Sequence, residues 1–310
     1  MLLTHGARAP LRPVALAVGN FDGIHRGHQA MLQRLLAGAR QRGLQSCVLT
    51  FEPHPREFFA PHAAPTRLAS LREKLELLAA YGVERTHIQR FDRSFASLAP
   101  EAFAERVLAN TLRAQWLLVG EDFRFGAKRA GDVPLLKNLG GRYGYEAEIL
   151  PVVALGGVRV SSSAVRAALA RGDLVSAEGL LGRPYSISGR VVHGRKLGRE
   201  LGFATANVQL KHNRPPLTGI YAVRVHGVGT GSLPAVASLG VRPTITASGR
   251  AVLEVHLFDF SSDLYGAHMR VEFLHKIREE EKYADLDALK AQIERDCIAA
   301  KNFLLENRHV

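Results

Sequence analysis

Two histidines in a glycine-rich segment stand out in this 310-residue chain because their type and spacing suit phosphate chemistry. His25 and His28 are three residues apart, and Gly19, Gly23 and Gly27 punctuate the same stretch. Glycines let a backbone approach a ligand closely, and the amides at the start of a following helix can face phosphate oxygens. Two imidazoles beside a triphosphate can donate hydrogen bonds and stabilise the charge of a leaving pyrophosphate. The segment therefore predicts a nucleotide-binding turn.

Two other interpretations of this turn stay open: a solvated loop with incidental histidines, and a zinc site. The zinc site lacks an obvious further cluster of Cys, His or carboxylate ligands. A Walker A loop is excluded, because GxxxxGK[ST] occurs nowhere in the chain. We expect His25 and His28 to be catalytic, and the nucleotide to be bound by Gly19, Asn20, Phe21, Asp22 and Gly23.

The elements that must position these residues alternate between strand and helix patterns over the first 180 residues. Apolar runs predict strands at 14–18, 47–51, 115–119 and 145–150, and a helix starts at Ser162. Such alternation implies a parallel sheet with helices on both faces. Ligands of these sheets lie at the carboxyl ends of the strands, where the informative turns fall.

The pattern changes after about Leu181. Short β-rich runs separated by Gly and Pro predict a small antiparallel β-barrel. Asp285 is a helix N-cap, and the apolar residues after it recur at spacings of three or four, so a C-terminal helix packs on the barrel. We therefore expect a Rossmann-like α/β domain over residues 1–182 and a barrel domain over 183–310.

The composition fits a globular protein that binds polyanions. The formal net charge is +12, from 41 basic and 29 acidic residues, and such a surface attracts nucleic acid and nucleotide phosphates alike. Cys47 and Cys297 lack metal-site spacing, so we expect two buried free thiols, a reducing compartment and a cytoplasmic location. No apolar run approaches the roughly 20 residues of a membrane span, and the run 14–18 is too short for a signal peptide.

Several segments resemble, in order, the bacterial bifunctional riboflavin kinase/FAD synthetase family. GNFDGIHRGHQ resembles the HxGH signature of nucleotidyltransferases in the form found in that family's N-terminal half. Ser163 and Ala69 stand where the family pattern has threonine, and Ala204 stands where it has proline. The resemblance extends from Val14 to about Leu305. The other matching segments are TFEPHP (50–55), VGEDFRFG (119–126), VSSSAVR (160–166), GFATAN (202–207) and EVHLFD (254–259).

For the first half, the resemblance implies attack of the FMN phosphate on the α-phosphorus of ATP, with Mg²⁺ present. FAD forms and pyrophosphate leaves, without a protein nucleophile. Hydroxyls at the start of a helix can bind phosphates, and an arginine one turn later can bind a phosphate bidentately. The alternative interpretation, an ordinary serine-rich N-cap without a ligand, stays open. The nucleotide-binding residues expected here are Ser161, Ser162, Ser163 and Arg166. The flavin-binding residues expected past the strand 115–119 are Asp122, Phe123, Arg124 and Phe125, of which either Phe could stack on the flavin or belong to the core.

For the second half, the resemblance implies a riboflavin kinase without a P-loop. Thr205 and Asn207 offer a hydroxyl and an amide oxygen that would point the same way in a strand and hold Mg²⁺ and the ATP phosphates. Glu254 would take the proton of the riboflavin 5′-hydroxyl, unless it is a surface residue of an edge strand. Gly194, Gly202 and the basic loop 194–199 would cover the phosphates, unless that loop is a solvated turn.

The sequence leaves three functions to distinguish. The leading one is a bifunctional enzyme acting on riboflavin, FMN, FAD and ATP, with neither a membrane nor nucleic acid as partner and the oligomeric state open. A second keeps only the adenylyltransferase and makes the barrel a flavin-binding module, with Ala204 as its support. A third is a basic nucleic-acid-binding protein, which explains the charge but none of the motifs.

Overall fold

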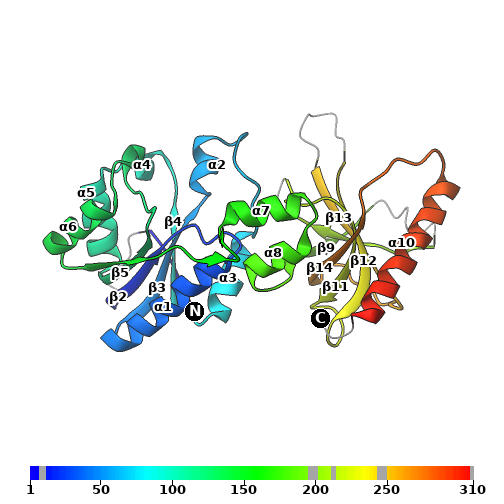
Figure 1. Ribbon diagram of the computed structural model, residues 1–310, viewed down its shortest axis with the longest axis horizontal. Helices are drawn as coiled ribbons and strands as arrows, with labels where there is room; N and C mark the ends of the chain where they lie inside the picture. The colour runs from blue at the N-terminus through cyan, green and yellow to red at the C-terminus, as the bar shows by residue number, and fades with distance from the viewer. Residues whose placement is uncertain (7–11, 195–201, 211–213, 243–249, 308–310) are drawn as a thin grey trace. The chain divides into compact units, whose positions relative to one another are not determined.

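The computed structural model describes residues 1–6, 12–194, 202–210, 214–242 and 250–307 (Figure 1). The chain forms two compact units. The first comprises Met1–Pro65 and Leu71–Ser161, and the second comprises Thr66–Ser70 and Ser162–Val310. The domain boundary expected between residues 182 and 183 stays a prediction.

The first unit is built on a six-stranded sheet with the order β1-β4-β3-β2-β5-β6. Every neighbouring pair is parallel, which confirms the predicted α/β sheet. The central strand β2 is buried at all five positions, as expected of a strand covered on both faces. The strands are β1 (Leu2–His5), β2 (Val14–Val18), β3 (Gln45–Glu52), β4 (Arg85–Arg90), β5 (Ala114–Gly120) and β6 (Glu146–Leu150), with the separate hairpin β7 (Ala154–Leu155) and β8 (Val158–Arg159).

Helices cover both faces of this sheet, and β2 shows how. On one face of the sheet, Leu16 packs in a cluster with apolar residues of helices η1 and α6. On the other face, Ala15 and Ala17 pack with Leu32 and Leu35 of α1. This period-two division fixes where β2 ends and where its turn emerges. The helices are α1 (Arg26–Arg42), α2 (Pro55–Phe59), α3 (Leu71–Ala80), α4 (Arg93–Ala96), α5 (Pro100–Ala102), the π-helix η1 (Phe103–Thr111), the 3₁₀ turn η2 (Ala127–Arg129) and α6 (Val133–Tyr143).

The second unit contains a closed antiparallel barrel with the strand order β10-β13-β12-β11-β14-β9. Closure pairs every strand edge, and the predicted barrel is confirmed. Helices α7 (Ser162–Ala170) and α8 (Leu174–Leu181) precede it, and α8 packs against β9 and β14. The strands are β9 (Tyr185–Val192), β10 (Ala206–Gln209), β11 (Gly219–His226), β12 (Leu233–Arg242), β13 (Arg250–Leu257) and β14 (His268–Arg278).

The C-terminal helix α10 (Leu286–Glu306) lies against the outside of the barrel (Figure 1). Asp285 caps it as predicted, its side chain accepting a hydrogen bond from the Ala288 amide at 2.7 Å. Cys297, Ala300 and Leu304 pack against outward-facing apolar residues of β11 and β12. Leu286, the first of the apolar residues whose spacing predicted this packing face, is exposed instead.

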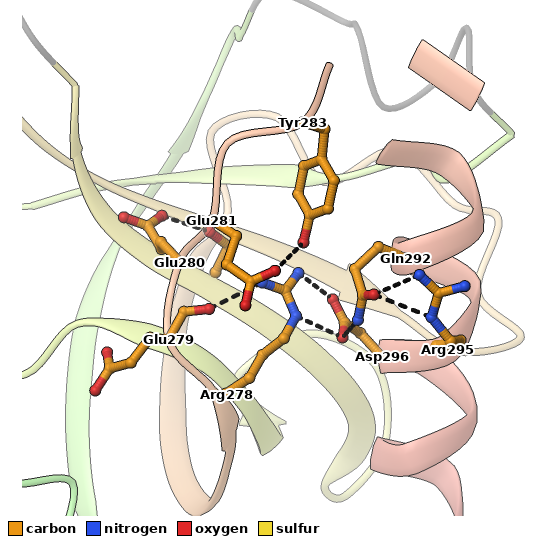
Figure 2. A network of polar contacts seen from close by, with 9 residues as sticks. Arg278, Glu279, Glu280, Glu281, Tyr283, Gln292, Arg295 and Asp296 are labelled. Atoms are coloured by element: carbon orange, nitrogen blue, oxygen red, sulfur yellow. Dashed lines mark hydrogen bonds and ion pairs between the residues drawn. The ribbon is translucent and has the colours of Figure 1, made fainter. Parts of the chain in front are cut away.

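Polar contacts fasten the end of β14 to the same helix (Figure 2). Arg278 donates two hydrogen bonds to Asp296, at 2.8 and 2.6 Å, and Gln292 donates a third at 2.9 Å. A bidentate arginine–carboxylate pair restricts orientation as well as distance. These contacts thereby hold the end of β14 to the middle of α10.

Cys47 and Cys297 are both buried and free, which confirms the prediction from their spacing. Burial raises the pKa of the Cys47 thiol to about 12 and that of Cys297 to about 11. Among the described residues, no helix is both long and apolar enough to cross a membrane.

Candidate active sites

The predicted nucleotide-binding turn connects β2 to the first turn of α1. His25 is the N-cap of α1, and its Nδ1 accepts a hydrogen bond from the His28 amide at 3.3 Å. The two imidazole rings stack, with centroids 3.8 Å apart and planes inclined by 17°. Because Nδ1 of His25 accepts, the proton of the neutral ring lies on Nε2, from which it can be donated to a phosphate oxygen. The structure thus brings the two predicted histidines together at a helix N-terminus.

His28 is held in its neutral form. Burial lowers its pKa well below the ordinary value, and the nearby His25 and Lys74 lower it further. Nδ1 of His28 and Oδ1 of Asn20 are buried and have no hydrogen-bond partner among the described residues. Buried polar atoms are normally paired, so a polar ligand that binds at this turn would provide hydrogen-bond partners for both atoms.

The backbone of the turn is strained in a way that the core enforces. Phe21 and Ile24 have φ values of 49° and 40°, in the left-handed region that favours glycine, and both side chains are fully buried. Gln29 closes the turn by donating from Nε2 to the Ile24 carbonyl at 2.9 Å. Strained residues persist where their surroundings fix them, and they cluster at ligand sites. At Gly27, a Cβ would lie 3.2 Å from the His25 ring, so a side chain there would crowd the pair of histidines.

Sequence reasoning missed a lysine beside this turn. Lys74 of α3 is buried, and its Nζ donates to the Thr50 hydroxyl at 3.3 Å. That hydroxyl in turn donates to the Asn20 carbonyl at 3.2 Å. A buried ammonium group is a rare feature that suits binding of an anion. The available signal was its spacing, because Lys74 lies four residues before the buried Leu78 and so shares the inward face of α3.

The serine segment starts a helix, as predicted. Helix α7 begins at Ser162, so Ser161 precedes it and Ser163 lies in its first turn. Nε of Arg166 donates to the Thr66 carbonyl at 2.5 Å, within the second unit. That these hydroxyls and Arg166 join the turn of the first unit stays a prediction.

The four predicted flavin-binding residues differ in accessibility. Phe125 is only 5% exposed and belongs to the core, whereas Phe123 is half-buried and stacks on it with centroids 5.7 Å apart. Asp122 pairs with Arg159 at 2.6 Å, and both Asp122 and Arg124 are exposed. Phe123 is therefore the ring that can meet a ligand, with Phe125 supporting it from beneath.

A chain of phenylalanine rings continues from this pair, and sequence reasoning missed it. Successive ring centroids lie 5.2–6.0 Å apart, mostly edge to face. Phe59, at its end, is 67% exposed. Most of the other rings are half-buried, and a partly exposed aromatic surface suits a flat aromatic ligand. The chain comprises Phe51, Phe58, Phe59, Phe91, Phe95, Phe103, Phe123 and Phe125.

In the barrel, the strand register assembles a second set of polar groups. Asn207 on β10 lies directly opposite Glu254 on β13, and Glu254 lies opposite Ser238 on β12. Directly opposite residues of antiparallel strands share a face, with Cβ atoms roughly 5 Å apart. Thr205 lies one residue before β10 begins. The predicted amide oxygen and carboxylate are therefore neighbours on the outer face of the barrel, although 47 positions separate 207 from 254 in sequence.

The two predicted glycines differ in what surrounds them. A Cβ built on Gly194 would overlap the Asn207 amide group, so this backbone lies directly over the site. Gly202 has a φ of 92° and nothing within 4 Å of such a Cβ, so only its conformation requires glycine. The rest of the predicted phosphate-covering loop, residues 195–199, lies outside the described residues.

A second carboxylate, that of Glu280, reaches Ser238 in this set of polar groups from the segment after β14. The Ser238 hydroxyl donates to Glu280 at 3.2 Å, and a Cβ on Gly240 would overlap the Glu280 carboxylate. Figure 2 shows Glu280 extending away from Arg278 and Asp296. Nothing in the local sequence placed Glu280 near Glu254, because three different strands and a loop are involved.

The fold and these sites define a two-site transferase, with a nucleotidyltransferase-type turn on a parallel sheet and a carboxylate-bearing phosphotransfer site on a barrel. The FAD synthetase family model matches residues 8–164, and the riboflavin kinase family model matches residues 181–304. The chain belongs to the family of bifunctional riboflavin kinase/FMN adenylyltransferases.

Relatives support this assignment over nearly the whole chain. The bifunctional riboflavin kinase/FMN adenylyltransferase of Escherichia coli strain K12 is 51% identical over 297 residues, covering 96% of this chain and 95% of the relative. That of Pseudomonas fluorescens is 48% identical over 305 residues, covering 98% and 97%. A crystal structure described as a macrolide-efflux protein from Streptococcus pneumoniae has the same fold, with a TM-score of 0.80, 29% identity and 99% coverage of both chains.

Proposed function

We propose that this chain phosphorylates riboflavin to FMN in its second unit and transfers AMP from ATP to FMN in its first, giving FAD and pyrophosphate. The proposal is carried by one observation: each unit has its own set of phosphate-directed groups. The first has the stacked pair His25 and His28, and the second has Asn207 opposite Glu254. Neither set contains an activated nucleophile, which suits direct transfer between two bound substrates.

In the first unit, the turn binds the triphosphate of ATP. The amides that open α1 and the N–H groups of His25 and His28 donate to phosphate oxygens, and Lys74 adds positive charge. An oxygen of the FMN phosphate attacks the α-phosphorus, the bond to the β-phosphate oxygen breaks, and pyrophosphate takes the charge. Phe123 stacks on the isoalloxazine ring and so orients the attacking phosphate.

In the second unit, Glu254 accepts the proton of the riboflavin 5′-hydroxyl. The oxygen of that hydroxyl bonds to the γ-phosphorus of ATP, and the bond from the γ-phosphorus to the bridging oxygen breaks, so ADP leaves. Thr205 and Asn207 hold the phosphates in line with the hydroxyl. Glu254 is opposite Asn207 in the register, so the base and the phosphate-holding groups meet where the new bond forms.

The oxygen donors of the second unit suit Mg²⁺. The Thr205 hydroxyl and the Asn207 amide oxygen are hard ligands, and Mg²⁺ in such sites takes few protein ligands beside phosphate oxygens and water. When bound, Mg²⁺ would neutralise phosphate charge. Among the described residues, no group of three or more His, Cys, Asp or Glu side chains is arranged to hold a metal ion, so ATP itself would supply the remaining ligands.

Product analysis of two variants tests the assignment of the sites. The full-length protein is incubated with riboflavin, ATP and Mg²⁺, and riboflavin, FMN and FAD are separated with time. His28→Ala should stop at FMN, whereas Glu254→Gln should make no FMN yet convert added FMN to FAD. Equal loss of both activities in either variant would contradict two independent sites. The free buried thiols also support our proposal that the protein works in the reducing cytoplasm.

A further inference from the structure

His256 is a histidine of the kinase unit to which the proposed reaction gives no task. It lies on β13 two residues after Glu254, so both side chains are on the outer face of the barrel. Its Nδ1 is 2.9 Å from the Ala204 carbonyl oxygen. A carbonyl oxygen only accepts, so the ring donates its Nδ1 proton, and this bond fixes the tautomer.

Aromatic contacts hold the ring in that position. Phe203 and Phe258 meet it edge to face, with centroids 5.6 and 5.8 Å from that of His256. Phe203 also packs against the apolar cluster under α10. The hydrogen bond and these contacts attach residues 203 and 204 to β13.

The attached segment leads directly to the phosphate-holding groups. Residues 203–205 are not part of a strand, and β10 begins only at Ala206. The described residues show no side-chain hydrogen bond other than that of His256 reaching Ala204. Alanine at this position does not restrict φ as proline would, so the hydrogen bond restrains a backbone that its own sequence leaves free.

We propose that His256 is a positioning residue of the kinase site. By donating to the Ala204 carbonyl, it fixes the backbone ahead of Thr205 and so presents Thr205 and Asn207 to the phosphates of ATP. This inference rests on the proposed role of Thr205 and Asn207 in binding ATP.

The test compares three variants of the full-length protein by the KM for ATP and the kcat of riboflavin phosphorylation. His256→Ala should raise KM about three- to tenfold, the worth of one net hydrogen bond, with kcat within about twofold. His256→Asn, whose Nδ2 replaces Nδ1, should stay close to the parent. Adding Ala204→Pro to His256→Ala should recover most of the lost affinity, because proline restrains the same backbone.

Formation of FAD from added FMN on the same chain is the folding control and should not change. An unchanged KM in His256→Ala, or a rise that neither the asparagine nor the proline reverses, would overturn the inference. Asn207→Ala separates the two proposals. If it raises KM while His256→Ala does not, only the positioning role is wrong; if it also leaves KM unchanged, the proposed ATP site itself is wrong.

Discussion

Replacing Gly194 by alanine should disable the kinase while leaving the protein folded. A Cβ at this position would lie 2.5 Å from Cγ and 2.8 Å from Oδ1 of Asn207, with a still closer approach to Nδ2. The φ angle of Gly194 is not in the left-handed region, so alanine does not strain the backbone. The Asn207 amide must rotate away, and its oxygen then leaves the row that it forms with Glu254.

The size of the effect follows from the interaction that is lost. A hydrogen bond or ligand bond to a charged group contributes roughly 1.5–3 kcal/mol, which corresponds to about a 10- to 100-fold lower kcat/KM for ATP. The free energy of unfolding should fall by less than about 1 kcal/mol, because only the end of one side chain moves.

The assay measures both reactions on one preparation: FMN from riboflavin, and FAD from added FMN. Gly141→Ala is the matched control, since Gly141 of α6 has nothing within 4 Å of an added Cβ. It should leave both rates unchanged. If Gly194→Ala kept kcat/KM for ATP within about twofold, the Asn207 amide would not be a ligand in the reacting complex.

Two further predictions concern stability. Burial, with a smaller effect of Arg85, lowers the pKa of His87 from 6.5 to about 4. Between these two pH values the unfolded chain binds a proton at His87 that the folded protein does not bind. The free energy of unfolding should therefore be highest above pH 6.5 and should fall by up to about 3 kcal/mol as the pH drops to 4. Urea unfolding followed by the fluorescence of Trp116, the sole tryptophan, measures this free energy. It should depend less steeply on pH in His87→Leu than in the parent protein, and the same pH dependence in both would refute the prediction. Asp296→Ala should cost about 2 kcal/mol by leaving Arg278 without its bidentate partner. Thermal unfolding measures this, and an unchanged melting temperature would contradict it.

The parts of the fold that sequence predicted are those whose pattern is local. VALAV is apolar throughout and ends in glycine, so β2 and its turn were predictable. Strand β4 was missed because RTHIQR has a polar composition, yet Arg85, Thr86 and His87 are buried. Its position between β1 and β3 buries it, and composition carries no information about neighbours that are distant in the chain.

The same distinction applies to the sites. His25 and His28 share one turn, so their spacing alone predicted that they meet. The bond from Ser238 to Glu280 joins positions 42 residues apart, and that from His256 to Ala204 joins positions 52 apart. The barrel register creates these contacts, and register is set by the whole set of strands. Sequence reasoning therefore found the groups that we propose to face the substrates, but not the residues that contact and position those groups.

The protonation states of the buried groups agree with the proposal that both phosphorus transfers proceed without a covalent intermediate. With pKa values raised to about 12 and 11, Cys47 and Cys297 stay protonated near neutral pH and cannot act as thiolates. His28 is neutral because its burial, and to a smaller extent the nearby His25 and Lys74, oppose a further charge. A triphosphate supplies the opposite charge, and the same neighbours then favour the complex. Under the proposed function, the neutral ring of His28 would share a proton with the phosphates of ATP once their negative charge offsets that of its neighbours.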